Sequence, residues 1–247
     1  MKENNSFGGI NMVGIPIRDD DTDRRTFPFV TVALIAINVL VFVLYELPMM
    51  TSDAAFETAL RSATLVPYDF VRHIFTLEAW MDLFRSMFMH ASWEHILGNM
   101  LYLWIFGDNV EDAFGHIAYL FFYLLCGVAA AFAHVLLAMN SQVPTLGASG
   151  AIAGVLGAYL VLFPGRRVIA LVPGGARMMT QETTALAMIG LWFVFQFISM
   201  IAGLGAIDQG GVAFAAHVGG FIAGAAIGYL WKQAFGVRST PTRIRPA

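Results

Sequence analysis

Long charge-free segments constrain this chain more than any other feature. No Lys, Arg, Asp or Glu occurs over residues 27–45 or between Asp112 and Arg166, and the second interval is long enough for two membrane spans. A transmembrane helix needs about 20 consecutive, mostly apolar residues. Only 13% of the residues are charged, against about 25% in an ordinary soluble domain. The chain is therefore predicted to fold within a lipid bilayer.

Six apolar segments predict an all-α membrane protein, a bundle of six transmembrane helices. The predicted helices cover residues 27–45, 92–108, 116–138, 149–163, 183–203 and 212–233. They form one domain over residues 27–233, between an N-terminal tail of residues 1–26 and a C-terminal tail of residues 234–247. The stretch 46–91 is too polar to span. We expect it to be a long first outer loop whose short amphipathic helices lie at the membrane surface.

Basic residues in the connecting segments predict the orientation, because Lys and Arg near the ends of spans resist translocation. With six helices and the N-terminus inside, eleven of the 14 Lys and Arg residues are cytoplasmic and three are outside. The three outside are Arg61, Arg72 and Arg85. The eleven inside are Lys2, Arg18, Arg24, Arg25, Arg166, Arg167, Arg177, Lys232, Arg238, Arg243 and Arg245. Both termini are therefore predicted to be cytoplasmic.

Several classes of function are disfavoured by composition. The net charge is -3 and the basic residues are scattered, so we expect no nucleic-acid partner. Cys126 is the only cysteine, which excludes an intrachain disulfide. No HExxH motif is present, and we expect neither a metal nor another cofactor. We expect no cleaved signal peptide, organelle presequence or extra domain. The expected home is the bacterial cytoplasmic membrane.

Polar residues inside the predicted spans fall at their outer ends. Ionisable groups in a bilayer are costly and usually functional. Ser149 starts the fourth helix, and His217 lies about 7 Å along the sixth at about 1.5 Å per residue. His95 and Asn99 stand one turn apart on one face of the second helix, because i and i+4 share a face. These four side chains are predicted to lie at one depth.

Rows of small residues give a second reason to bring the fourth and sixth helices together. The sixth helix carries Gly220, Gly224 and Gly228, and the fourth carries Gly150 and Gly154. Helices in lipid approach closely where small residues recur every four positions. Such packing places a serine and a histidine within the roughly 2.6–3.2 Å that general-base activation requires.

A serine at a helix start also has donors for an oxyanion, because the first N–H groups of a helix lack intrahelical acceptors. We expect the backbone N–H of Ser149, the side chain of Asn99 and His95 to supply the oxyanion hole. His95 and Asn99 remain open to a purely structural role. No acidic residue lies near His217 except Asp208, so a Ser-His dyad is predicted, with Asp208 as the alternative third member.

Three motifs together resemble the rhomboid family of intramembrane serine proteases. They are the GxSG turn at Gly147-Ala148-Ser149-Gly150, an AHxGGxxxG helix from Ala216 to Gly224, and an HxxxxHxxxN helix running from His90 through His95 to Asn99. The resemblance covers residues 27–233. It implies a serine endopeptidase that needs no cofactor and cleaves the transmembrane segments of membrane proteins. The resemblance also implies that these substrates reach the site past the fifth helix. His90 then shapes the first loop and supports the site.

Two positions depart from the family pattern. The first loop of the family carries a Trp-Arg pair, whereas Trp80 and Arg85 are separated here. A tyrosine that often follows the nucleophile by four residues, stacking on the histidine, is replaced by Ala153. Other contacts are then needed to hold His217. The competing functions are a transporter and a proteolytically inactive rhomboid-like protein that binds transmembrane helices.

Overall fold

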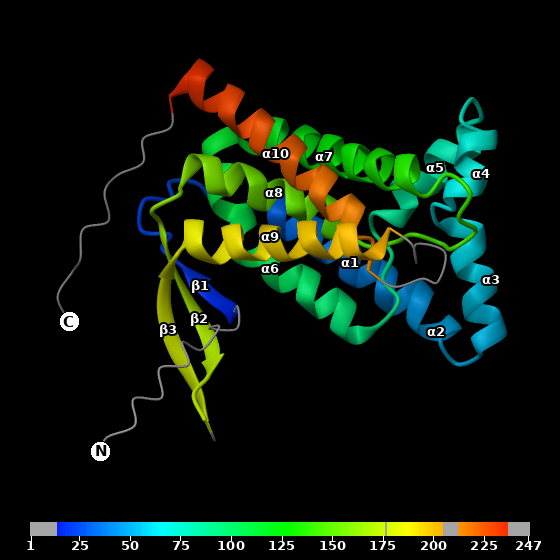
Figure 1. The fold of residues 1–247 in the computed structure, drawn as a ribbon, viewed down its shortest axis with the longest axis horizontal. Coiled ribbons are helices and arrows are strands. Elements are labelled where there is room, and N and C mark those ends of the chain that lie inside the picture. Colours follow the sequence, from blue (N-terminus) through cyan, green and yellow to red (C-terminus); the bar gives the residue numbers. More distant parts are fainter. Residues whose placement is uncertain (1–13, 176, 205–211, 237–247) are drawn as a thin grey trace.

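The computed structural model describes residues 14–175, 177–204 and 212–236, which form a helical bundle with a small sheet at one end (Figure 1). A π-helical segment, Phe42–Glu46, joins the first two helices into one rod. The helices are α1 (Phe29–Val41), α2 (Leu47–Met49), α3 (Asp53–Ala63), α4 (Pro67–Arg72), α5 (Leu77–Ser86), α6 (Trp93–Phe114), α7 (His116–Leu137), α8 (Ser149–Leu162), α9 (Ala185–Gly203) and α10 (Phe214–Phe235). The strands are β1 (Ile15–Asp19), β2 (Arg167–Pro173) and β3 (Met178–Thr184).

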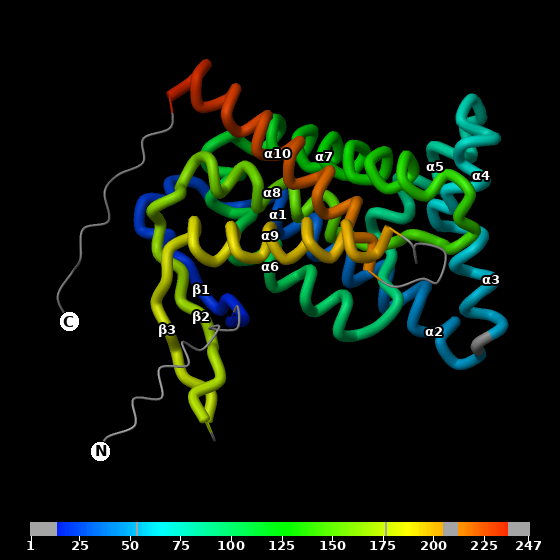
Figure 2. The backbone as a smooth tube through the Cα atoms, viewed as in Figure 1, coloured from blue at the N-terminus to red at the C-terminus, as the bar shows by residue number. Residues whose placement is uncertain are grey.

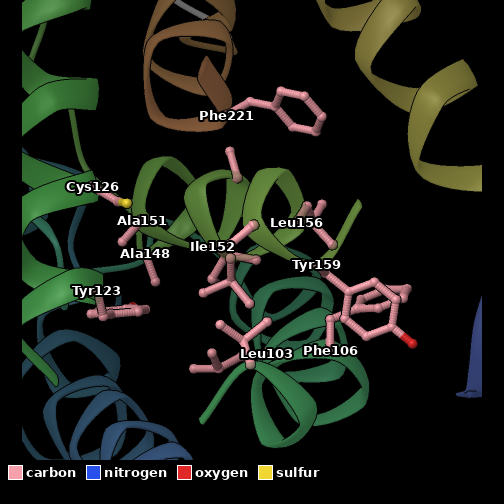
Figure 3. Close-up of a cluster of buried hydrophobic side chains, with 14 of the residues drawn as sticks. Leu103, Phe106, Tyr123, Cys126, Ala148, Ala151, Ile152, Leu156, Tyr159 and Phe221 are labelled. Atoms are coloured by element: carbon pink, nitrogen blue, oxygen red, sulfur yellow. The ribbon is translucent and has the colours of Figure 1, made fainter. Parts of the chain in front are cut away.

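Helix α8 is the centre of the bundle. It packs against α10, α7, α6 and α9, and Figure 3 shows Ile152 and Leu156 of α8 with Leu103 and Phe106 of α6 on one side and Phe221 of α10 on the other. Its 14 residues extend only about 21 Å at about 1.5 Å per residue. A helix surrounded by other helices does not itself have to match the thickness of a bilayer. Ser149, the first residue of α8, therefore lies inside the bundle, between the helices that surround α8.

Helices α8 and α10 pack backbone to backbone through glycine. A Cβ atom on Gly224 would overlap the carbonyl oxygen of Gly154, and one on Gly220 would overlap that of Gly150. A Cβ on Gly228 would come within 2.9 Å of Ala158 Cα. The small-residue rows read from the sequence therefore face each other, and any larger side chain at these positions would force the two helices apart.

The structure supports a membrane protein that is mostly helical. Four of the described helical stretches are long and apolar enough to span a bilayer, namely Phe29–Met49, His116–Leu137, Ala185–Gly203 and Phe214–Phe235. Helix α8 is apolar but shorter, and α6 contains four acidic residues. The number of six spans therefore stays a prediction.

Helix α6 continues to Phe114, beyond the predicted boundary at residue 108, because its buried acidic side chains have partners. Glu111 accepts hydrogen bonds from the backbone and hydroxyl of Thr31 at 2.7 Å, and it contacts His116 Nδ1 at 2.6 Å. Asp108 pairs with Arg24 at 2.5 Å. The sequence prediction ended the helix at the charged residue Asp108. The contacts of Asp108 and Glu111 with other parts of the chain allow α6 to continue to Phe114.

The segment between α2 and α6 holds three short helices, α3 to α5, at one end of the bundle (Figure 1). Trp80 and Arg85 act separately within it. The Trp80 indole N–H donates to Ile74 O at 2.8 Å, and its ring packs near Phe70 and Phe132. Arg85 pairs with Glu78 and Asp82, each at 3.0 Å. Trp80 and Arg85, which are not adjacent in the sequence, thus serve different contacts.

A three-stranded antiparallel sheet, in the order β1-β2-β3, is a feature that the sequence analysis did not predict. Figure 2 shows the chain leaving α8, forming the β2–β3 hairpin and returning into α9. Strand β1, from the segment predicted as a tail, pairs with β2 from Ile15 opposite Leu171 to Asp19 opposite Val168. Because β3 extends to Thr184, α9 begins at Ala185 instead of residue 183.

Polar side chains fasten this sheet to the bundle. The Asp19 carboxylate accepts hydrogen bonds from Tyr159 Oη at 2.5 Å and from Asn109 Nδ2 at 2.8 Å. Arg166 donates to Asn109 Oδ1 and to the backbone oxygen of Asp20. We call Asp19, Asn109, Tyr159 and Arg166 the sheet-end network. It joins β1 to the ends of α6 and α8.

Candidate active site

Ser149 and His217 meet across the α8–α10 interface. Ser149 is the first residue of α8, and His217 lies in the first turns of α10. Ser149 Oγ lies 2.8 Å from His217 Nε2, inside the range of about 2.6–3.2 Å in which a base takes a proton from a hydroxyl. The glycine contacts along the interface bring the two backbones close enough for this bond.

The turn before Ser149 requires glycine at residue 147. Gly147 has φ +123°, a conformation that side-chain-bearing residues rarely adopt. A Cβ there would lie 2.7 Å from His95 Nε2 and 3.5 Å from Ser149 Oγ. The Gly147 N–H donates to Ser86 O at 2.8 Å, which ties the turn to α5. The turn thus sets Ser149 beside the His95 ring.

Gly150, the other glycine of the turn motif, faces Ala130 of α7. A Cβ atom on Gly150 would come within 2.6 Å of the Ala130 side chain.

His95 and Asn99 bring two nitrogen groups to the same place. His95 Nδ1 accepts the Ala91 N–H at 3.5 Å, which favours the tautomer that carries its proton on Nε2. Asn99 Nδ2 is buried and makes no hydrogen bond to a described residue. Both side chains line the cavity that contains Ser149 and His217. The arrangement offers hydrogen-bond donors to a negatively charged oxygen near Ser149.

His90 lies behind the site and does not line its cavity. The ring is fully buried and packs edge-on against His95, with 5.0 Å between ring centroids. Burial lowers the pKa of His90 to about 3, and the neighbouring His95 acts in the same direction. Its backbone N–H donates to Glu46 Oε1 at 2.5 Å. The neutral ring therefore supports His95 and fixes the first loop to the end of the first helical rod.

The cavity around Ser149 has a volume of about 800 Å³. Its walls come from α6 to α10 and from the connection before α8, and most of its surface is apolar. Residues that line it besides the four named polar ones include His134, Val143, Leu146, Ala153, Trp192 and Phe214. An extended peptide with small or apolar side chains fits such a space.

Two residues of α9 near His217 were not found from the sequence. Gln196 Oε1 lies 2.8 Å from His217 Nδ1, and the Trp192 ring centroid lies 5.9 Å from that of His217. Gln196 is the only carboxamide in the apolar run of α9, and an amide in a span without a partner is costly. That signal was available in the sequence.

Ala153 is fully buried and presents no ring to His217. The alternative third member, Asp208, lies outside the described residues.

The sequence predicts neither a metal nor another cofactor. Among residues 14–175, 177–204 and 212–236, no group of three or more His, Cys, Asp or Glu side chains is arranged to hold a metal ion. Cys126 is buried against Gly154 of α8. It packs in the core shown in Figure 3.

A comparison with protein-family models matches a rhomboid domain over residues 77–234. This range includes all three motifs that carry the resemblance, and His90, Ser149 and His217 fall inside it. The match covers well over half of the chain.

Curated proteins give the same result. The chain is 31% identical over 212 residues to the rhomboid protease GluP of Bacillus subtilis, covering 85% of this chain and 37% of that protein. It is 29% identical over 210 residues to the mitochondrial rhomboid protein 1 of Saccharomyces cerevisiae, covering 82% of this chain and 53% of the relative. It is 33% identical over 143 residues to the human mitochondrial presenilin-associated rhomboid-like protein, covering 57% and 35%. The chain thus spans about half of these relatives or less.

Proposed function

The chain belongs to the rhomboid family, and from this premise we propose that it is an intramembrane serine endopeptidase with Ser149 as nucleophile and His217 as general base. It is an integral multi-pass membrane protein. The observation that carries the proposal is the 2.8 Å approach of Ser149 Oγ to His217 Nε2 at the edge of a largely apolar cavity.

The reaction begins when Ser149 Oγ attacks the carbonyl carbon of a peptide bond while His217 Nε2 takes the hydroxyl proton. A tetrahedral intermediate forms, with negative charge on the former carbonyl oxygen. His217 then gives the proton to the leaving amine, the C–N bond breaks, and an acyl enzyme remains. Water attacks this ester with His217 again as base, which releases the new carboxyl terminus and restores Ser149.

The oxyanion is stabilised by the N–H of Ser149, by Asn99 Nδ2 and by His95 Nε2. Asn99 Nδ2 has no competing partner among the described residues, and His95 keeps its Nδ1 toward Ala91. Donors that are already oriented in a low-dielectric site are worth more than donors in water, because they do not have to reorganise.

The proposed substrates are transmembrane segments of membrane proteins. A helical segment hides its peptide carbonyls in internal hydrogen bonds, so a scissile bond must first leave the helix. The apolar walls of the cavity accept such an unwound stretch from lipid. The proposal extends to six spans with both termini in the cytoplasm, which the distribution of Lys and Arg supports. It also includes the bacterial cytoplasmic membrane as the location.

The test is cleavage of a single-span reporter by the purified protein in detergent and in liposomes. Ser149→Ala and His217→Ala should each lower cleavage by at least about 10³-fold, while the melting temperature stays that of the wild type. Ser62→Ala on α3 and His73→Ala beside α4 are matched controls that should cleave normally. If the wild type does not cut but binds the reporter, the inactive helix-binding alternative replaces the proposal.

A further inference from the structure

The ring of His217 is held from α9, a helix that does not carry the dyad. Gln196 contacts its Nδ1 at 2.8 Å, and Trp192, one turn earlier, lies beside the ring face at an interplanar angle of 35°. Residues i and i+4 of a helix share a face. Both contacts therefore come from one stripe of α9.

We propose that Gln196 is the positioning residue for His217, selecting the tautomer and orientation in which Nε2 accepts the Ser149 proton. The proposal rests on the proposed serine protease function. With Gln196 Oε1 toward the ring, Nδ1 must carry the proton and Nε2 keeps its lone pair for Ser149 Oγ. Without that acceptor the neutral ring is free to protonate Nε2, which cannot then act as a base.

Gln196 is buried at this contact, unlike most of its helix. Gln196 is 6% exposed, while most large side chains of α9 point outward, including Phe195 at 60% and Ile198 at 60% exposure. A carboxamide that faces lipid without a hydrogen-bond partner is strongly unfavourable, because lipid offers it neither donor nor acceptor. The side chain accordingly turns inward, to the His217 imidazole. Its position is set by the same contact that sets the ring.

Residue 153 of α8, the nucleophile's own helix, supplies no ring contact to His217. Ala153 on α8 is buried and too small to stack on His217. The two contacts that position the ring come instead from Gln196 and Trp192 of α9. Because Gln196 reaches across from α9, a displacement of α9 away from α10 would remove the Nδ1 acceptor.

The experiment compares Gln196→Leu with Gln196→Glu, and with Phe195→Leu as a control for the helix itself. Gln196→Leu should lower kcat by about 10- to 100-fold with little change in KM, from loss of one buried hydrogen bond and a misplaced base. Gln196→Glu keeps an acceptor and should recover most of kcat. In the pH profile of kcat/KM, the acid limb of the Gln196→Glu variant should move to higher pH, because the new carboxylate stabilises the protonated His217 ring. Phe195→Leu should behave as the wild type.

Two further histidines, His95 and His134, line the same cavity, and both are unchanged in every variant. A difference between profiles therefore reports His217. A merely structural role predicts a different pattern: both Gln196 variants lose melting temperature and activity in parallel, with an unmoved acid limb. That pattern, or full activity in Gln196→Leu, overturns the proposal.

A second readout needs no turnover and separates this proposal from the protease function. In protein labelled with ¹⁵N-histidine, the His217 signals, assigned by their loss in His217→Ala, should show a protonated Nδ1 and an unprotonated Nε2. In Gln196→Leu they should show a mixture of tautomers. An identical tautomer in both proteins rejects the positioning role even if the wild type cleaves. Absence of cleavage in the wild type with the expected tautomer change rejects the protease function alone.

Discussion

The two ends of the bundle treat their buried polar groups in opposite ways. In the sheet-end network, Asp19, Asn109 and Arg166 bond one another or nearby groups. At the Ser149 end, Asn99 Nδ2 is buried without a partner among the described residues and faces a cavity. An unsatisfied buried donor costs about 1–3 kcal/mol. The sheet end therefore stabilises the fold, and the Ser149 end keeps donors available for a ligand.

Asn99 and Asn109 test this contrast with the same substitution on one helix, α6. Asn99→Ala should lower kcat by about 10²- to 10³-fold, as loss of one oxyanion donor does elsewhere, and leave the melting temperature unchanged. Steady-state cleavage of the reporter and thermal unfolding in detergent measure both quantities. A fall in melting temperature that accounts for the lost activity would assign Asn99 to helix packing instead.

Asn109→Ala should give the reverse result. It removes the donor to Asp19 and the acceptor of Arg166, at a cost of about 1–3 kcal/mol in the free energy of unfolding. At temperatures where the variant remains folded, kcat should equal that of the wild type. Thermal unfolding should show the loss. A variant with normal stability and reduced kcat would show that the two ends are not independent.

Asp19 gives a smaller, pH-dependent effect. Burial raises the pKa of Asp19 from its ordinary 3.8 to about 7, and the nearby charge of Asp108 acts in the same direction, opposed by the Tyr159 hydrogen bond and by Arg166. Between these values the folded carboxyl keeps a proton that the unfolded one releases. The free energy of unfolding contributed by Asp19 therefore falls as pH rises from about 4 to 7.

Asp19→Asn should remove this decline, since an amide mimics the protonated carboxyl and still accepts from Tyr159. The expected difference is a slope of a few degrees in Tm between pH 5 and 7, roughly, that the variant lacks. Thermal unfolding across that range measures it. Equal slopes in the two proteins would place Asp19 outside the pH response.

The sequence could predict the parts of this fold that depend on local pattern. Charge-free runs marked the long helices, and spacing of small residues marked the α8–α10 contact. The end of α6 was placed too early, since Glu111 and Asp108 find partners in Thr31 and Arg24 that the local sequence does not show. Strand β1 was missed because its partner β2 lies about 150 residues away in the chain, a pairing set by tertiary structure.

The site divides along the same line. Motif spacing placed Ser149, His217, His95 and Asn99 at one depth, and the structure has all four on one cavity. The contact of Gln196 with His217 depends on how α9 leans on α10. No spacing rule within either helix predicts it. Single polar residues in an apolar span, such as Gln196, are the signal to follow in related sequences.

The central claim is that His217 activates Ser149, and labelling by a fluorophosphonate tests it most directly. The reagent forms a covalent bond only with an activated serine hydroxyl, and mass spectrometry of the digested protein locates it. The account predicts a label on Ser149 that is lost in His217→Ala although Ser149 is still present and the protein is folded. A label on another serine, or equal labelling of Ser149 in His217→Ala, would contradict it.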